Sequence, residues 1–162
     1  MATYYSDVSA DPSRMYDTPG VSLKQPFFLT TTALLVAGDI LNLCPILTNC
    51  TVTGYQVDFP ALDTATQTAT AKLGITGSDA IFVASGDTLV RAAGRYSSPG
   101  SAAAGTTFIG CLNNALPRVF TTPNSLILTM VAAVSTSCVV GTIIRGWLEY
   151  TMQPKYRKPR RA

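Results

Sequence analysis

The side chains that usually carry acid–base and nucleophilic catalysis are scarce in this sequence. Its 162 residues include no histidine, which removes both the commonest general base and the commonest metal ligand. Serine–histidine and cysteine–histidine nucleophile pairs are therefore excluded, as are HExxH and mixed cysteine–histidine zinc sites. No glycine-rich phosphate loop of the GxxxxGKS/T or GxGxxG type occurs. We therefore expect a protein that is not an enzyme and that carries no cofactor.

The cysteines do not form a recognisable metal or redox motif. Cys44 and Cys50 are six positions apart and lack a CxxC pair, so a four-thiolate zinc site is not expected. The start of the chain, MATYYSDVSADPSR, lacks the basic and then apolar stretch of a secretory signal. Synthesis in the cytosol with reduced, mostly buried thiols is expected, and pairing among Cys44, Cys50, Cys111 and Cys138 stays open.

The aspartates are placed as turn residues rather than as catalytic pairs. Asp58 and Asp63 flank Pro60, and Asp79 and Asp87 lie beside glycines, which is typical of turns. No segment has the spacing of an EF-hand, although calcium binding stays an alternative. We expect no catalytic and no metal site from these carboxylates.

The composition favours a protein that is covered by other proteins. The chain is 47% hydrophobic and only 13% charged, whereas charged residues usually approach a quarter of a soluble domain. A surface so poor in charge costs little to desolvate, which suits burial against neighbouring subunits. The alternative is simply a stable β domain.

The net charge of +3 comes from the C-terminus. Residues 25–150 hold six acids against five bases, whereas the last twelve residues hold five bases and no acid. The tail has two interpretations: contact with nucleic acid through phosphates, or a solubilising end that docks on an acidic partner. The second is favoured, because no basic face is expected elsewhere. The basic residues of the tail are Lys155, Arg157, Lys158, Arg160 and Arg161.

Alternating apolar and polar residues predict strands through most of the chain. The alternation is clearest in two segments. In 53–59 the residues on the predicted buried face are Thr53, Tyr55, Val57 and Phe59, and in 69–75 they are Ala69, Ala71, Leu73 and Ile75. Residues 79–85 fit either a strand or the start of a helical turn. The last predicted strand, 138–151, has Arg145, Trp147 and Glu149 on its polar face. About eight strands at this spacing predict an all-β fold, either an antiparallel β-sandwich or a jelly roll.

The domain organisation follows from where alternation begins and ends. Residues 1–24 show no sustained period and are predicted to be an extended arm that is disordered or, because of its tyrosines, lies along a neighbouring subunit. Residues 25–151 form the sandwich or jelly-roll domain, and residues 152–162 form a flexible basic tail. Residues 126–144 contain no charge and resemble a transmembrane span, but their serines and threonines favour two strands joined by a hairpin.

Three stretches of the chain resemble one class of virion proteins. They are FFLTTTALLVAGDILNL, VDFPALDTATQTATAKLGITGSDAIFVAS and LILTMVAAVSTSCVVGTIIRGWLEYT, within roughly residues 25–151. With an N-terminal arm before them, they resemble the small β-structured virion proteins of tailed bacteriophages, in the head decoration or cement class. The cysteines and the basic tail depart from that pattern.

The resemblance implies a capsid accessory protein at the capsid surface, assembled in the cytoplasm of a bacterial host. Its partners would be the major capsid protein lattice and copies of itself, as a dimer or trimer. Because aromatic residues carry most interface energy, the expected anchors include aromatic side chains. The candidate partner-binding residues are Tyr4, Tyr5, Arg14, Met15, Tyr16 and Trp147. The alternatives are a tail-, neck- or fibre-associated virion protein, or a carbohydrate-binding jelly roll using Asn113 and Asn114 near Phe108.

Overall fold

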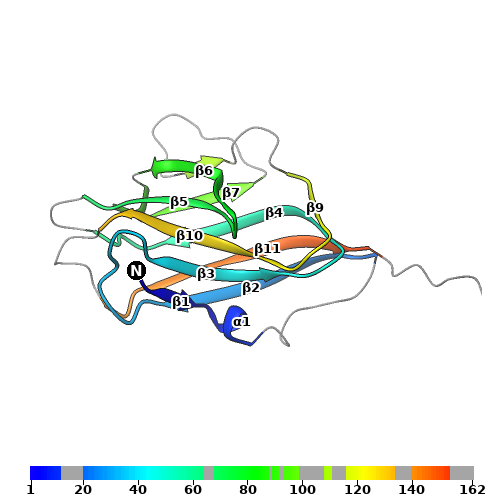
Figure 1. Ribbon diagram of the computed structural model, residues 1–162, viewed down its shortest axis with the longest axis horizontal. Coiled ribbons are helices and arrows are strands. Elements are labelled where there is room, and N and C mark those ends of the chain that lie inside the picture. Colours follow the sequence, from blue (N-terminus) through cyan, green and yellow to red (C-terminus); the bar gives the residue numbers. More distant parts are fainter. Residues whose placement is uncertain are drawn as a thin grey trace, which may run out of the picture.

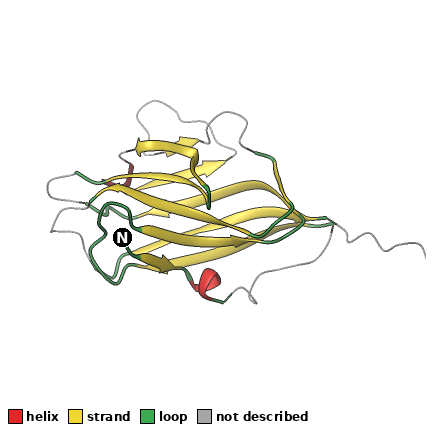
Figure 2. Cartoon of the chain, viewed as in Figure 1, coloured by secondary structure: helices red, strands yellow, loops and turns green. Residues whose placement is uncertain are grey.

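The structure, a computed structural model, describes residues 1–11, 20–63, 68–87, 89–91, 93–98, 108–110, 116–133 and 140–153. These ranges are almost entirely strand (Figure 2), as the alternation predicts, and the all-β class is confirmed. In chain order the elements are β1 (Thr3–Tyr5), α1 (Asp7–Ala10), β2 (Ser22–Thr30), β3 (Ile40–Ile46), β4 (Cys50–Phe59), β5 (Thr70–Ile75), β6 (Ser78–Asp87), the 3-10 turn η2 (Leu89–Arg91), β7 (Gly94–Ser98), β8 (Phe108–Gly110), β9 (Arg118–Phe120), β10 (Asn124–Ala132) and β11 (Ile143–Met152).

The strands form two layers (Figure 1), in the orders β1-β3-β10-β5-β6 and β2-β11-β4-β7-β8, with β9 attached to β4. Four antiparallel pairs lie nested in the sequence: β2 with β11, β3 with β10, β4 with β7, and β5 with β6. Within these eight strands the first therefore pairs with the last and the two middle ones pair with each other. This is a long hairpin wound into two sheets, the topology of a jelly roll.

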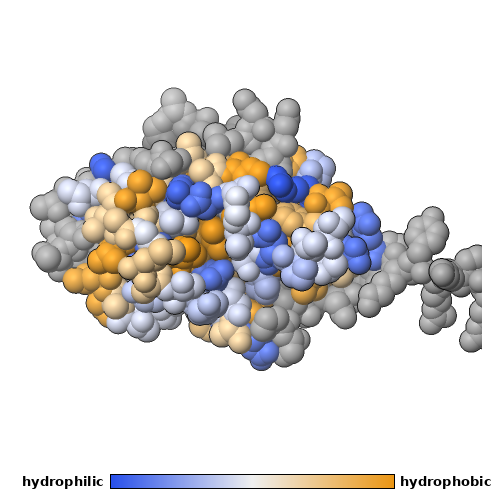
Figure 3. Space-filling model, in the orientation of Figure 1, coloured by the Kyte–Doolittle hydropathy of each residue, from blue (hydrophilic) through white to orange (hydrophobic). Residues whose placement is uncertain are grey.

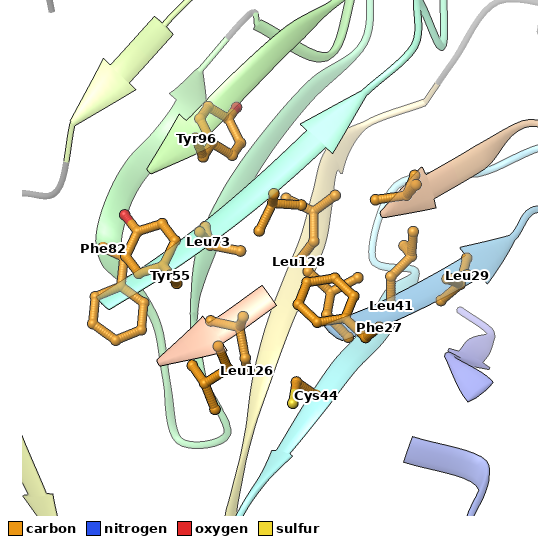
Figure 4. Packing of buried hydrophobic residues seen from close by; sticks show 14 of the residues in the cluster. Phe27, Leu29, Leu41, Cys44, Tyr55, Leu73, Phe82, Tyr96, Leu126 and Leu128 are labelled. Atoms are coloured by element: carbon orange, nitrogen blue, oxygen red, sulfur yellow. The ribbon is translucent and has the colours of Figure 1, made fainter. Parts of the chain in front are cut away.

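The inner faces of the two sheets enclose one hydrophobic core (Figure 4). The rings of Tyr55 on β4 and Phe82 on β6 lie 5.0 Å apart and join the two layers. Phe59 and Tyr96 meet edge to face at 4.7 Å. All four rings are buried, and burial of such a side chain contributes about 1.5–3 kcal/mol. The core therefore fixes which face of each strand remains available to a partner.

One detail of the alternation in β4 is wrong. Thr53 is predicted to share the buried face of Tyr55 and Val57, but it is only half-buried, whereas Val52 is fully buried. The register between β11 and β4 shifts next to Gly54, and both Gly54 and Tyr55 are buried there. This bulge inverts the alternation in the first half of the strand.

Much of the N-terminal segment predicted as an arm lies on the chain's own sandwich. Residues Thr3–Tyr5 form β1, which pairs in parallel with β3, and Ser22–Thr30 already form β2. Ser6 caps helix α1 by accepting a hydrogen bond from the Ser9 N–H at 3.1 Å, and Val8 is buried in the core. Residues 1–11 are thus held in two ways: β1 pairs with the edge of β3, and the Val8 side chain is buried in the core. Local sequence does not reveal such a long-range pairing. Residues 12–19 lie outside the described part.

The uncharged run 126–144 is divided between the sheets. Its beginning lies in β10 and its end in β11, which belong to different layers. Among the described residues, no helix has the length and apolar character needed to cross a membrane. The two predicted strands are therefore confirmed, but the hairpin between them is wrong, because β10 pairs with β3 and β5 whereas β11 pairs with β2 and β4.

Candidate protein-binding surfaces

The outer face of the second sheet carries an aromatic and cationic group of side chains. In the register of the sheet, Trp147 on β11 lies beside Pro26 on β2 and Gln56 on β4. Arg145 lies beside Phe28, whose side chain is 50% exposed. They face outward because the residues that alternate with them are buried in the core. We call this group the Trp147 face: Lys24, Pro26, Phe28, Arg145 and Trp147.

Lys24 orients the indole of Trp147. The Lys24 Nζ lies 4.4 Å from the centroid of the Trp147 ring and 3.7 Å from the Glu149 Oε2. A cation over an indole is attracted by the ring electrons, whereas an exposed ion pair such as Lys24–Glu149 adds little. The indole of Trp147 is half-buried, so part of its surface is left to contact a partner.

A hollow of about 510 Å³ opens beside the indole. Gly146 is one of its lining residues, and an added Cβ there would overlap the Gln56 carbonyl oxygen and approach Phe27 Cζ at 2.8 Å. Glycine is therefore required for β11 to approach β4 closely. The hollow is lined by Asp7, Pro26, Phe27, Phe28, Gln56, Asp58, Arg145, Gly146 and Trp147.

Arg145 is the cation left available on this face. Asp58, opposite it on β4, is engaged elsewhere: Arg95 Nε donates to one Asp58 oxygen at 2.5 Å and Gln56 Nε2 to the other at 2.8 Å. Arg145 forms no ion pair with any residue that the structure describes. An exposed guanidinium beside Phe28 and Trp147 can bind a carboxylate or carbonyl group of a partner.

A second surface lies at one end of the sandwich, where five large apolar side chains are exposed. Figure 3 shows hydrophobic atoms gathered at the lower left, the end where β2 finishes and β11 begins in Figure 1. The exposed fractions lie between 37% for Val131 and 52% for Ile143. We call this group the apolar end: Leu34, Val36, Val131, Val140 and Ile143.

Backbone hydrogen bonds assemble the apolar end from distant parts of the chain. The Thr31 N–H donates to the Thr142 carbonyl at 2.9 Å, and the Gly141 N–H donates to the Thr31 carbonyl at 2.7 Å. The Gly38 N–H donates to the Met130 carbonyl at 2.8 Å. These bonds bring together the two long uncharged runs, 25–38 and 126–144. The sequence analysis missed this surface, although the two runs were its signal.

The structure separates the expected anchors rather than gathering them. Tyr4 and Tyr5 lie on β1 in one sheet, and Trp147 lies on β11 in the other. Tyr4 packs against the core, and Tyr5 is 60% exposed. The N-terminal segment instead contributes Asp7 to the hollow beside Trp147, a residue that the sequence analysis did not select.

Several predicted site residues lie outside the described part of the chain. They are Arg14, Met15 and Tyr16, Asn113 and Asn114, and the basic tail Lys155, Arg157, Lys158, Arg160 and Arg161. Their partner-binding roles stay predictions.

The cysteines that the structure describes are buried thiols. Cys44 and Cys50 are both buried, and neither is part of a disulfide. Burial raises the pKa of Cys50 to about 11 and raises the pKa of Cys44 further, with the nearby Asp7 carboxylate adding to the latter. Among the residues that the structure describes, no cluster of three or more acidic or cysteine side chains could hold a metal ion. Cys111 and Cys138 lie outside the described residues.

Comparisons with known proteins reveal similarity of structure and not of sequence. No protein-family model matches the chain, and no curated protein matches it. The fold is similar to a chain of the solved structure "Capsid of Ralstonia phage GP4", with a TM-score of 0.69 and 20% identity, covering 94% of this chain and 99% of that one. It is also similar to a chain of "Cyanophage Pam1 capsid asymmetric unit", with a TM-score of 0.56 and 17% identity, covering 87% and 96%. The likeness is one of fold, and it extends over nearly the whole of each chain.

Proposed function

We propose that this chain is a non-enzymatic structural protein of a bacteriophage virion, which binds the major capsid protein lattice and stabilises the head as a decoration or cement protein. One observation carries the proposal: the jelly roll matches chains of two phage capsid structures almost from end to end. The match covers 99% and 96% of those chains, so each of them is close to this chain in length. A chain of that size in a capsid supports a role beside the shell lattice.

The Trp147 face is the surface that we assign to the capsid lattice. Tryptophan and arginine are the residue types that most often dominate binding energy at protein interfaces. Trp147 and Phe28 offer apolar area, and Arg145 offers a cation that is unpaired within the described residues. Each contact can be weak, because a shell repeats it in many copies and the contributions add.

The chemistry of the chain supports a structural rather than a catalytic role. The sequence holds no histidine, and the described thiols are buried with raised pKa values. The Trp147 face and the apolar end are built from side chains that bind rather than react. The tyrosines of the N-terminal segment and the basic tail remain candidate contacts beside these surfaces.

Binding to particles tests the proposal directly. Particles that lack the protein would be mixed with the purified chain, and the bound copies would be counted by quantitative mass spectrometry. Hundreds of copies per particle are expected for a decoration protein, whereas a dozen or fewer would assign the chain to a tail, neck or fibre. Trp147→Ala should weaken binding at least tenfold, since loss of a central tryptophan costs about 2 kcal/mol or more.

Val119→Ala is the matched control for this experiment. Val119 is 54% exposed on β9, which lies in the same sheet as Trp147 but outside the Trp147 face. Its substitution should leave particle binding unchanged. Equal binding by Trp147→Ala and by the wild-type chain would overturn the assignment of the face, and absence of wild-type binding would overturn the function.

A carbohydrate-binding module is the second candidate, and the hollow beside Trp147 favours it. An indole next to Gln56 and Asp58 offers a ring for a sugar to stack on and polar atoms for its hydroxyls. Lys24, however, already lies over the indole ring. Isothermal titration with oligosaccharides of the host cell surface separates the two candidates, since a decoration protein should give no heat of binding.

A further inference from the structure

We propose that Asp7 positions the hollow beside Trp147 and that the N-terminal segment, residues 1–11, is thereby part of the capsid-binding surface. This role rests on the proposed function, in which the Trp147 face binds the capsid lattice. Among the described residues that line the hollow, Asp7 alone comes from outside the second sheet, because all the others lie on β2, β4 and β11. One side of the hollow therefore depends on a segment from another part of the fold.

Helix α1 places Asp7 there because it bridges the two sheets. β1, which precedes the helix, pairs with β3 of the first sheet, and the Ser6 hydroxyl donates to the Leu43 carbonyl on β3 at 2.5 Å. Asp7, the next residue, reaches the second sheet, where its Oδ1 accepts a hydrogen bond from the Phe28 N–H at 2.9 Å. Figure 1 shows α1 at the edge of the sandwich, in contact with β1 and β2. Two consecutive residues thus join both layers.

The contact with Asp7 fixes the part of β2 that lines the hollow. β2 is the outermost described strand of its sheet and is paired on one side, with β11. Two residues of the hollow, Pro26 and Phe28, lie on β2, where Pro26 is the partner of Trp147. Because a strand paired on one side opens more easily than a central strand, loss of the Asp7 contact should loosen β2 beside the indole.

Docking of the N-terminal segment and binding at the hollow are therefore coupled. Among residues 1–11 only Ser6 and Val8 are buried, and a terminal element with so few buried side chains opens at a lower free energy than the core. A partner in the hollow meets the Asp7 side and a fixed Phe28 only while the segment is docked, so binding and docking strengthen each other. A purely structural role for Asp7 would instead change stability and leave the hollow unaltered.

The fluorescence of Trp147 tests this role in the purified full chain without any virus particle. Acrylamide should quench the indole more strongly in Asp7→Ala than in the wild-type chain, whereas Asp7→Asn, which keeps a side-chain oxygen, should restore the wild-type quenching constant. Asn124→Ala is the matched control, because it removes a hydrogen bond to the Thr76 carbonyl at 3.3 Å in the first sheet, outside the hollow. It should cost similar stability and leave the quenching unchanged. Circular dichroism should show the same fold for all variants.

Affinity for particles tests the coupling. Asp7→Ala should raise the dissociation constant for particles about fivefold or more, Asp7→Asn should restore it, and Asn124→Ala should bind as the wild-type chain does. Wild-type quenching or wild-type affinity in Asp7→Ala, or equal changes in Asp7→Ala and Asn124→Ala, would overturn the role of Asp7. If the wild-type chain binds no particle, the proposed function fails, and the quenching comparison still decides whether Asp7 positions the hollow.

Discussion

The backbone N–H of Phe28 donates a hydrogen bond to the Asp7 Oδ1 at 2.9 Å, across 21 positions of the sequence. Phe28 lies on β2, the outermost strand of its sheet, and Asp7 is the first residue of helix α1. The Asp7 carboxylate thus accepts a hydrogen bond from a backbone N–H at the edge of the sheet, where another strand could otherwise pair. Edge strands are commonly protected in this way against unwanted pairing. The same contact attaches the N-terminal segment to the sandwich.

Removal of this contact should loosen the N-terminal segment. Asp7→Ala deletes the acceptor for the Phe28 N–H, and we expect a loss of about 0.5–1.5 kcal/mol in the free energy of unfolding. Asp7→Asn keeps a side-chain oxygen and should retain most of that stability. Denaturant unfolding compares the two variants, and hydrogen exchange at the Phe28 amide should quicken only in Asp7→Ala. Equal exchange in both variants would contradict the role of Asp7.

The close approach of β11 and β4 predicts that position 146 tolerates only glycine. In Gly146→Ala the added Cβ would meet the Gln56 carbonyl oxygen and the Phe27 ring, and we expect a loss of about 3 kcal/mol. Gly77→Ala is the comparison, because it has open space but a φ of +85°. Its cost should be smaller, about 1 kcal/mol, and conformational. Thermal unfolding of both variants checks the order, which the opposite ranking would refute.

The buried carboxylate of Asp39 should be important for stability. It accepts hydrogen bonds from the Ala2 N–H at 2.5 Å and the Val36 N–H at 2.9 Å. Asp39→Ala leaves both donors without this acceptor, and we expect a loss of about 2–4 kcal/mol. Asp79→Ala removes an exposed partner of Lys72 and should cost less than about 1 kcal/mol. Chemical denaturation measures both, and a similar cost for the two would argue against the buried network.

The described thiols should resist alkylation in the native protein. Burial raises the pKa of Cys50 to about 11, so its reactive thiolate form is scarce at pH 8 and increases as the pH approaches 11. Cys44, with a pKa raised further, should react last. Iodoacetamide labelling followed by peptide mass spectrometry resolves each cysteine, with denatured protein as the control. Rapid labelling of Cys44 in the folded chain would contradict its burial.

Trp147 is the one tryptophan of the sequence, so its fluorescence reports on the Trp147 face alone. If this face meets the capsid lattice, binding to particles removes water from the indole and should shift its emission to shorter wavelength. Lys24→Gln removes the cation over the ring and should alter the emission of the free chain. An emission unchanged by saturating particles would place the contact elsewhere.

Local sequence predicted strands best where one face is buried along the whole strand. Ala71, Leu73 and Ile75 in β5 are all buried as their spacing of two indicates. Thr53 was misassigned because a bulge depends on the register with β11, which no local pattern encodes. Residues 79–85 had two interpretations, and pairing with β5 made them part of a strand. The apolar end went unnoticed because Leu34 and Val140 are over a hundred positions apart in the chain.

Periodicity was sufficient to predict the all-β class, since a two-residue period requires a sheet with one buried face. Composition alone excluded serine–histidine and cysteine–histidine nucleophile pairs, since the sequence contains no histidine. They also predicted that Trp147 and Arg145 point away from the core. Only tertiary structure decided what stands beside them, because Pro26, Gln56 and Asp7 reach that face through hydrogen bonds between distant segments. Strand pairing depends on long-range contacts throughout the core. It alone determines that the two uncharged runs, 25–38 and 126–144, lie together at one end of the sandwich.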